Sequence, residues 1–391
     1  KTAIDVLMGM YHYKDRFAEI RQRYGWIMEA AMKYRTEAGT LLDYVVFLYV
    51  QQDYKKAVYV AERTKELFGC MDEEVDDAHW IMLYNNLANL YNDTQRQQEA
   101  EELYKKAMGI RERLAGRNAE AYEFDLVVSY NNLANLYSDT QRQTEAEEMY
   151  KKAVGILERL TERNAEEHES VLAVGYNNLA VLYSVTQRQK EAEEMYKKAV
   201  GIQERLAERN AEEHEGDLAM SYGNLANLYS DTQRQQEAEE MCKKAVRIYE
   251  RLAGRNAEEH ESSLVASYNN LANLYRKSQR QQEAEKLCKK AVEIWERLAE
   301  RNAAAYEPNL VANYNNLAIL YSDMQRQQEA EEMYKKAVEI WERLAGRNAA
   351  AYEPRLAVCY WNISVLYLEM GKAFGRRIYQ KKAIKLAKKY P

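Results

Sequence analysis

Asparagine recurs at fixed intervals along this chain, and its side chain can both donate and accept hydrogen bonds. A row of such side chains can hold an extended peptide by its backbone, whatever the sequence of that peptide. The asparagines repeat at a step of 46 residues and form two main series. The first series comprises Asn85, Asn131, Asn177, Asn269 and Asn315, and the second comprises Asn89, Asn135, Asn227 and Asn273. We expect both series to contact a bound peptide.

Departures from these series are expected to set the preference for a ligand. Small or apolar residues replace asparagine at five positions, which are Gly223, Trp361, Val181, Ile319 and Val365. The acidic residues Asp139 and Asp231 follow shortly after the asparagines, whereas Arg276 and Lys277 form a basic interruption. We therefore expect a neutral to basic ligand that makes an apolar contact at Val181.

Two alternative roles for the asparagines stay open. They can tie adjacent repeats together through hydrogen bonds between helices, or duplication can have copied a neutral residue. A task at the surface is favoured because asparagine is a poorer helix former than Glu, Lys, Gln or Ala. For a third series we favour the inter-helix role, and its members are Asn86, Asn132, Asn178, Asn224, Asn270, Asn316 and Asn362.

Other reactive side chains do not suggest a catalytic or metal-binding group. His168, His214 and His260 share one repeat position, so helix packing keeps them about 10 Å or more apart. Metal ligands instead converge within about 2 Å of one ion. Tyrosine takes the same position in other repeats, so we expect these rings to pack at corners between repeats. Glutamate pairs such as Glu101 and Glu102 lie beside lysines, and we expect them to face solvent rather than act as catalytic acids.

The cysteines and tryptophans are predicted to be packing residues. Cys242 and Cys288 occupy a slot that holds tyrosine in four sister repeats, namely Tyr104, Tyr150, Tyr196 and Tyr334. Trp295 and Trp341 lie close to the apolar stripe of their segments. The sequence contains none of the phosphate-loop, zinc-helix or nucleophile-elbow motifs. We expect no cofactor, no metal and no enzymatic activity.

The elements that position these residues are predicted to be helices in a repeat array. The tripeptide Tyr-Asn-Asn starts at Tyr84 and returns at Tyr130, and altered copies keep the same step as far as Tyr360. Within one repeat, an apolar stripe at helical spacing predicts a first helix over about 125–138. A polar turn over 139–142 precedes a second helix from about Gln143, and the segment 163–168 then leads to the next repeat.

The pattern Tyr130-x-x-Leu133-Ala134-x-x-Tyr137, followed by Ala146, Tyr150 and Ala153, resembles the tetratricopeptide repeat signature. The Asn-Asn-Leu-Ala segments, and Glu-Pro-x-Leu before them, are similar to the kinesin light chain type of repeat. The resemblance covers about residues 84–370 and implies an all-α, right-handed superhelical solenoid of antiparallel helix pairs. It also implies that first-helix asparagines line a concave groove and contact a peptide. Similar bacterial arrays occur fused to protease-like effector domains.

The two ends of the chain differ from the regular repeats. Within 1–83 we expect an N-terminal helical cap over 1–36 and a degenerate repeat-like unit over 41–66. Seven units then fill 84–391, closed by a basic capping helix over 372–390. Terminal units of a repeat array are atypical because they cover its open core.

Composition narrows the class of partner. The net charge of −6 argues against nucleic acid, and no apolar run approaches the roughly 18–20 residues that span a bilayer. Few cysteines and no CxxC pair favour a reducing, cytoplasmic setting. The chain begins at Lys1, so further domains can lie outside it. We predict a protein-interaction scaffold. Its alternatives are a sensor or autoinhibitory arm of a larger effector, and an architectural array that associates with itself.

Overall fold

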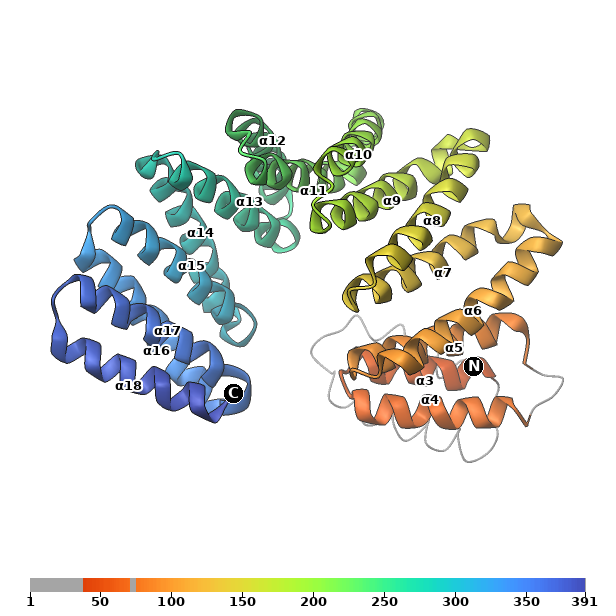
Figure 1. Ribbon diagram of the computed structural model, residues 1–391, viewed down its shortest axis with the longest axis horizontal. Helices are drawn as coiled ribbons and strands as arrows, with labels where there is room; N and C mark the ends of the chain where they lie inside the picture. Colours follow the sequence, from red (N-terminus) through yellow and green to blue (C-terminus); the bar gives the residue numbers. More distant parts are fainter. Residues whose placement is uncertain (1–37, 71–74, 391) are drawn as a thin grey trace. The chain divides into compact units, whose positions relative to one another are not determined.

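The computed structural model describes residues 38–70 and 75–390, and there the protein is all-α (Figure 1). The first helices of the repeats are α3 (Ala38–Val50), α5 (Asp77–Asp93), α7 (Ala119–Asp139), α9 (Ala165–Val185), α11 (Ala211–Asp231), α13 (Ala257–Lys277), α15 (Ala303–Asp323) and α17 (Ala349–Glu369). The second helices are α4 (Tyr54–Phe68), α6 (Gln97–Arg117), α8 (Gln143–Arg163), α10 (Gln189–Arg209), α12 (Gln235–Arg255), α14 (Gln281–Arg301), α16 (Gln327–Arg347) and α18 (Ala373–Lys389). The predicted all-α array of antiparallel helix pairs is confirmed.

The chain divides after Arg188 into two compact units, the first containing α3 to α9 and the second containing α10 to α18. Within each unit, every helix packs against the next one along the chain. The handedness of the array and the predicted division after residue 83 stay predictions. The cap expected over 1–36 lies outside the described residues, whereas the expected degenerate unit over 41–66 is the pair α3 and α4.

The apolar stripe of the first helices forms the core, as predicted. In α7, Tyr130, Leu133, Ala134 and Tyr137 are all buried. Ala134 is fully buried because its small side chain lets the neighbouring helix approach closely. The second helices contribute residues such as Tyr150, which is also buried. Each repeat therefore buries its stripe against the next helix rather than within a single central core.

The turn from first to second helix is a Schellman motif. Arg142 N donates to Tyr137 O at 2.7 Å, which satisfies a carbonyl at the end of α7. Gln141 between them has φ 60°, the left-handed conformation that this motif requires. Glutamine takes this position in the other described turns, and glycine takes it only before α18, at Gly371 with φ 68°. The same turn thus repeats, and its left-handed position is strained where glutamine occupies it but not at Gly371.

From α6 onwards the connection from second to first helix is a single residue, so one expectation from the sequence is wrong. The segment 163–168 is not a link of several residues, because α8 ends at Arg163 and α9 begins at Ala165. Asn164 alone has a non-helical backbone, with φ −145° and ψ 89°. At the equivalent Asn118 the side chain accepts a hydrogen bond from Ala121 N at 3.3 Å. This N-cap, followed by helix formers, starts the first helix about six residues earlier than predicted.

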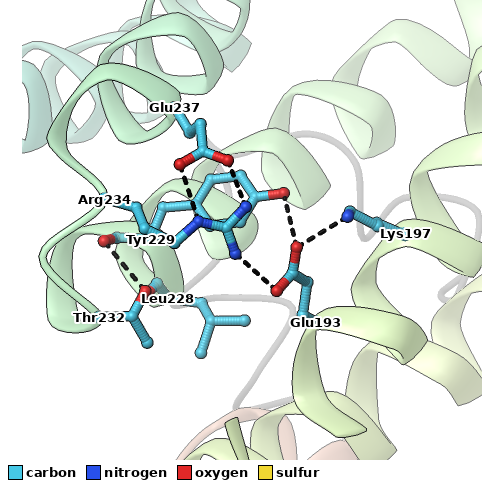
Figure 2. Close-up of polar contacts among 7 residues, drawn as sticks. All are labelled: Glu193, Lys197, Leu228, Tyr229, Thr232, Arg234 and Glu237. Carbon is cyan, nitrogen blue, oxygen red and sulfur yellow. Dashed lines mark hydrogen bonds and ion pairs between the residues drawn. The ribbon is translucent and has the colours of Figure 1, made fainter. Parts of the chain in front are cut away.

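A cluster of polar side chains joins each repeat to the one before it (Figure 2). The Arg234 guanidinium contacts Glu193 of the preceding second helix at 2.6 Å and also binds Glu237. It lies over the Tyr229 ring, 4.1 Å from the ring centre. The Tyr229 hydroxyl in turn donates to Glu193 at 3.3 Å, and Lys197 approaches the same carboxylate. We call this cluster the inter-repeat joint.

The inter-repeat joint recurs along both units. Its glutamate and cation are Glu62 with Arg96, Glu101 with Arg142, Glu147 with Arg188, Glu193 with Arg234, Glu239 with Arg280, Glu285 with Arg326, and Glu331 with Lys372. The expectation that both glutamates of each pair face solvent is therefore wrong. Glu101 is only 18% exposed in its side chain, whereas Glu148 of the next pair is 60% exposed and binds Lys152. Lys151 also contacts Glu147.

The predicted packing residues behave as expected. Cys242 and Cys288 are buried with free thiols, and Trp295 and Trp341 are each 5% exposed. His168 packs against Phe124 with ring centres 5.5 Å apart. Tyrosines at the same repeat position pack on the two tryptophans, with Tyr306 5.8 Å from Trp295 and Tyr352 5.7 Å from Trp341. This position is thus an aromatic corner between repeats.

Candidate binding face of the first helices

One face of the first helices is covered only in part by the neighbouring helices. On α7 it comprises Val128, Asn131, Asn135 and Asp139, and we call this set, with its equivalents, the asparagine face. Val128, Asn135 and Asp139 are exposed, whereas Asn131 is half-buried. The equivalent of Val128 is apolar and exposed in several repeats, as at Val174, Met220 and Val358. The face therefore combines amides with exposed aliphatic groups.

The first asparagine series lies between successive first helices rather than fully on the surface. Asn85, Asn131, Asn177, Asn269 and Asn315 are all half-buried. The Oδ1 atoms of Asn85, Asn131 and Asn269 are buried and have no hydrogen-bond partner within the described residues. Asn315 Oδ1 lies 3.7 Å from Cys359 Sγ, which is on the first helix of the next repeat. This contact corresponds to the inter-helix role that the sequence left open.

Most asparagines of the second series are more exposed than those of the first. In two repeats a buried tyrosine beneath the face donates a hydrogen bond to the asparagine side chain. The hydroxyl of Tyr104 donates to Asn89 Oδ1, and that of Tyr150 donates to Asn135 Oδ1. Burial raises the pKa of Tyr150 to about 12, so its hydroxyl keeps its proton at neutral pH. Each amide oxygen is thus positioned by a buried ring. Val181, which replaces asparagine in α9, is 46% exposed, and its apolar contact with a ligand stays a prediction.

Two repeats of the second unit lack that supporting ring. Asn227 and Asn273 occupy the same position as Asn135, but Cys242 and Cys288 stand where Tyr150 would be. Both thiols are buried. Burial raises the pKa of Cys288 to about 11, so this thiol stays protonated and is a poor nucleophile at neutral pH. It acts as a small apolar surface.

A cavity of about 350 Å³ opens at Cys288, between α13, α14 and α15. Its lining combines amides, one guanidinium and apolar groups, from Asn269, Asn270, Ala272, Asn273, Arg276, Ala284, Cys288, Asn316, Ile319 and Leu320. Three residues predicted from sequence, Asn269, Asn273 and Arg276, come together here. The cavity therefore places asparagines of two successive first helices around one hollow.

Arg276 and Lys277, the basic interruption, both contact other side chains of the protein. Arg276 Nη1 contacts Asp323 at 3.0 Å, and Arg276 Nη2 donates to Asn273 Oδ1 at 3.2 Å. Lys277 Nζ donates to Ser230 Oγ at 3.4 Å. These two basic residues also line a polar hollow of about 490 Å³ that includes Glu369. Asp139 and Asp231 are exposed at the ends of α7 and α11.

Sequence reasoning misses several residues of the cavity. It assigns Asn270 and Asn316 an inter-helix role, and it treats Ile319 only as a gap in the asparagine series. It correctly predicts that Cys288 is buried, but it does not predict that Cys288 lines a cavity. The signal in the sequence is the exchange of a large ring for a thiol, because a lost ring leaves space unless neighbouring side chains fill it.

Comparison with known proteins identifies the family. Two family descriptions, both of the tetratricopeptide repeat, match residues 77–159 and 263–343, and residues 172–214 and 218–261, respectively. The chain belongs to the tetratricopeptide repeat family, whose members are in general protein–protein interaction modules and typically non-enzymatic. A search of curated proteins found no match.

Solved structures share the fold. BtubC (BKLC) from P. vanneervenii, a kinesin light chain-like repeat protein, is 22% identical, with a TM-score of 0.52 over 65% of this chain and 92% of that chain. The quorum sensor NprR from B. thuringiensis in its apo form is 12% identical, with a TM-score of 0.55 over 98% and 97% of the two chains. The STAND protein PH0952 from Pyrococcus horikoshii, which has a tetratricopeptide repeat sensor, is 15% identical, with a TM-score of 0.57 over 96% and 53%.

Two further properties concern only the part of the chain that the structure describes. None of its helices is both long enough and apolar enough to cross a membrane. Its His, Cys, Asp and Glu side chains form no group of three or more that could hold a metal ion.

Proposed function

We propose that this protein binds an extended peptide segment of a partner along its asparagine face. The observation that carries the proposal is the cavity at Cys288, where Asn269, Asn273 and Asn316 from successive first helices line one hollow. A peptide backbone has one donor and one acceptor per residue, which amide side chains match without regard to sequence. Exposed apolar residues of the same unit, such as Met220 and Ile319, add apolar contact.

Asn135 shows how such an amide can be prepared for binding. Its Oδ1 already accepts the Tyr150 hydroxyl, so the side chain is oriented before a ligand arrives. Its Nδ2 remains as a donor towards a peptide carbonyl. A preoriented side chain loses less rotamer entropy when the ligand binds.

The partner is proposed to be neutral to basic. Asp139 and Asp231 are exposed on this face, whereas Arg276 is neutralised in part by Asp323. Charge reversal in the double variant Asp139→Lys and Asp231→Lys should weaken binding of a lysine-containing peptide and reduce its salt dependence. Unchanged affinity in a titration at low salt would contradict this charge preference.

The binding face can be tested with a displayed random-peptide library. Peptides selected on the wild-type chain are titrated against a triple variant, Asn269→Ala, Asn273→Ala and Asn316→Ala. A matched control carries Lys286→Ala, Glu293→Ala and Glu339→Ala, which alter exposed residues of second helices. Circular dichroism checks that both variants are folded.

The proposal predicts that selected peptides bind the control and lose affinity for the asparagine variant. Equal binding to both variants would place the site elsewhere. Failure to select any peptide would favour the alternatives, which are a sensor or autoinhibitory arm of a larger effector and an array that associates with itself. The sensor or autoinhibitory arm and a cytoplasmic location stay predictions.

Self-association is a second candidate because apolar side chains are exposed on the last helix. Phe374 is 80% exposed and Ile378 is 41% exposed, one turn apart on α18. If this patch joins two copies, the mass in solution should rise with concentration, and Phe374→Glu should abolish the rise. Sedimentation velocity over a range of concentrations measures both.

A further inference from the structure

The cavity at Cys288 has the position of a missing aromatic ring. In the repeats of Tyr104 and Tyr150, the ring from the second helix is buried beneath the asparagine face. At Cys288 the same slot holds a thiol, and the hollow that remains is lined by Ala272, Ala284 and Leu320 as well. These three residues are themselves buried, so they form an apolar floor.

The chain itself shows how a phenol fits such a slot. Tyr104 and Tyr150 bury their rings and donate their hydroxyls to Asn89 and Asn135. The corresponding amide at the cavity is Asn273, whose Oδ1 accepts from Arg276 at 3.2 Å. A carbonyl oxygen has two lone pairs, so it can accept a second donor. The groups that a buried tyrosine uses elsewhere in this protein are therefore present here without the tyrosine.

The charged residues at the rim of the cavity make it unfavourable for a charged side chain of the ligand. Arg276 disfavours a lysine or arginine there by repulsion. An acidic side chain would have to compete with Asp323, which already contacts Arg276 at 3.0 Å. A neutral ring with one polar atom at its edge avoids both costs.

We propose that this cavity is a specificity pocket for a tyrosine side chain of the bound peptide, with Asn273 Oδ1 accepting the phenol hydroxyl. The inference rests on the proposed function, because the ring is supplied by a segment lying on the asparagine face. The pocket would make the binding face prefer one residue type in the peptide and would fix the register of the peptide. The amides elsewhere on the face bind the peptide backbone whatever its sequence. One repeat thereby fixes where along a periodic surface the peptide binds.

p-Cresol, which reproduces the tyrosine side chain, is the probe for this pocket. The chain is labelled with ¹³C at isoleucine δ1 methyl groups, and the resonance of Ile319, which lines the cavity, is followed during titration. Toluene serves as the matched probe without a hydroxyl. We expect p-cresol to shift the Ile319 resonance and to bind more tightly than toluene.

Two exchanges provide matched variants. Cys288→Tyr restores the residue that four sister repeats carry in this slot, so the repeat should remain folded. Cys242→Tyr makes the same exchange at a residue that does not line this cavity. We expect Cys288→Tyr to weaken p-cresol binding at Ile319 by more than about tenfold, and Cys242→Tyr to leave it unchanged.

Three results would contradict the proposal that the cavity binds a tyrosine side chain. They are no shift of Ile319 with p-cresol, equal binding of p-cresol and toluene, and unchanged binding in folded Cys288→Tyr. These results are distinguishable from failure of the proposed function, which is read from selected peptides and the asparagine variant. Peptide binding without p-cresol binding would reject the pocket alone, and p-cresol binding without any selected peptide would reject the proposed function alone.

Discussion

One buried slot holds tyrosine in the repeats of Tyr104 and Tyr150 of the first unit, and cysteine in the repeats of Cys242 and Cys288 of the second. Both kinds have the same single-residue asparagine link and the same left-handed glutamine in the turn. Both also carry the inter-repeat joint, through Glu101 in one case and Glu239 in the other. The scaffold is therefore insensitive to the residue in this slot.

The exposed face is sensitive to that residue. In the repeats of Tyr104 and Tyr150, the ring supports the asparagine above it, as Tyr150 supports Asn135. Where the slot holds Cys288, Asn273 instead accepts from Arg276, and a cavity opens beside it. Two exchanges in this repeat, tyrosine to Cys288 and serine to Arg276, thus change the exposed face while the turns and links stay the same.

Converting a tyrosine repeat to the cysteine type should have the largest effect. Tyr150→Cys removes a buried ring and its hydrogen bond, so we expect a loss of about 2–4 kcal/mol. In a repeat array this loss should be concentrated near α7 and α8, because stability is a sum of local and nearest-neighbour contributions. Hydrogen exchange of backbone amides measures the loss and its location. The variant should also gain a p-cresol site, and a variant that gained none would contradict the origin of the cavity in a missing ring.

The paired asparagines should differ in their contribution to stability. Asn135→Ala leaves the buried Tyr150 hydroxyl without its partner, which should cost about 1–2 kcal/mol. Asn227→Ala should cost little, because Cys242 rather than a tyrosine lies in the slot beneath it. Denaturant unfolding of the two variants tests the difference, with Tyr150→Phe as a control that removes only the hydroxyl. Equal costs for both asparagines would contradict the supporting role of the ring.

Acid should loosen both kinds of repeat, because both use the inter-repeat joint. At Glu331, burial alone would raise the carboxyl pKa, but hydrogen bonds from Lys335, Lys372 and Tyr367 outweigh it and lower the pKa from 4.5 to about 2. The pKa values of Glu101 and Glu239 are lowered in the same way. A lowered folded-state pKa contributes stability that is complete above the unfolded-state value and is lost as pH falls.

Glu331 should lose its contribution to stability as the pH falls from about 4.5 to about 2. Thermal midpoints measured from pH 7 downwards should fall in this window, and Glu331→Gln should reduce the fall. If acid loosened only the cysteine repeats in hydrogen-exchange measurements, the joint would not be the shared element that we infer.

The smallest effect on stability is expected at the rim of the cavity. Arg276→Ser introduces the residue found at this position in several sister repeats, such as Ser138 and Ser230. It removes an ion pair whose side chains are 38% and 41% exposed, so the cost should stay below about 1 kcal/mol. Binding of a lysine-containing peptide should instead become tighter, because a positive charge leaves the face. Isothermal titration measures that change, and weaker binding would contradict a repulsive role for Arg276.

Much of the fold followed from local patterns. The apolar stripe from Tyr130 to Tyr137 predicted the first helix, and its spacing predicted which residues are buried. The start of that helix was missed, although Asn118, which caps it, is an asparagine directly before the helix formers Ala119 and Glu120. The inter-repeat joint was also missed, because Glu101 and Arg142 lie 41 residues apart and only stacking of repeats brings them together.

The candidate face was predicted in its composition and only in part in its geometry. Asn135 and Val181 are exposed as expected, but Asn131 is half-buried with its Oδ1 towards the interior. A helical wheel gives the direction of a side chain from its own helix axis. It does not show how near the next helix lies on that side.

The amino-acid sequence by itself determined the period, the helix pairs and the family, because these depend on side-chain spacing that repeats along one chain. Only the tertiary structure decided which amides remain available and where a cavity opens. Those properties depend on the distance between helices packed side by side, and on whether a neighbour such as Arg276 or Ile319 fills the space that a missing ring leaves. The exchange of tyrosine for Cys288 is visible in the sequence, but its consequence is a volume that exists only between three packed helices.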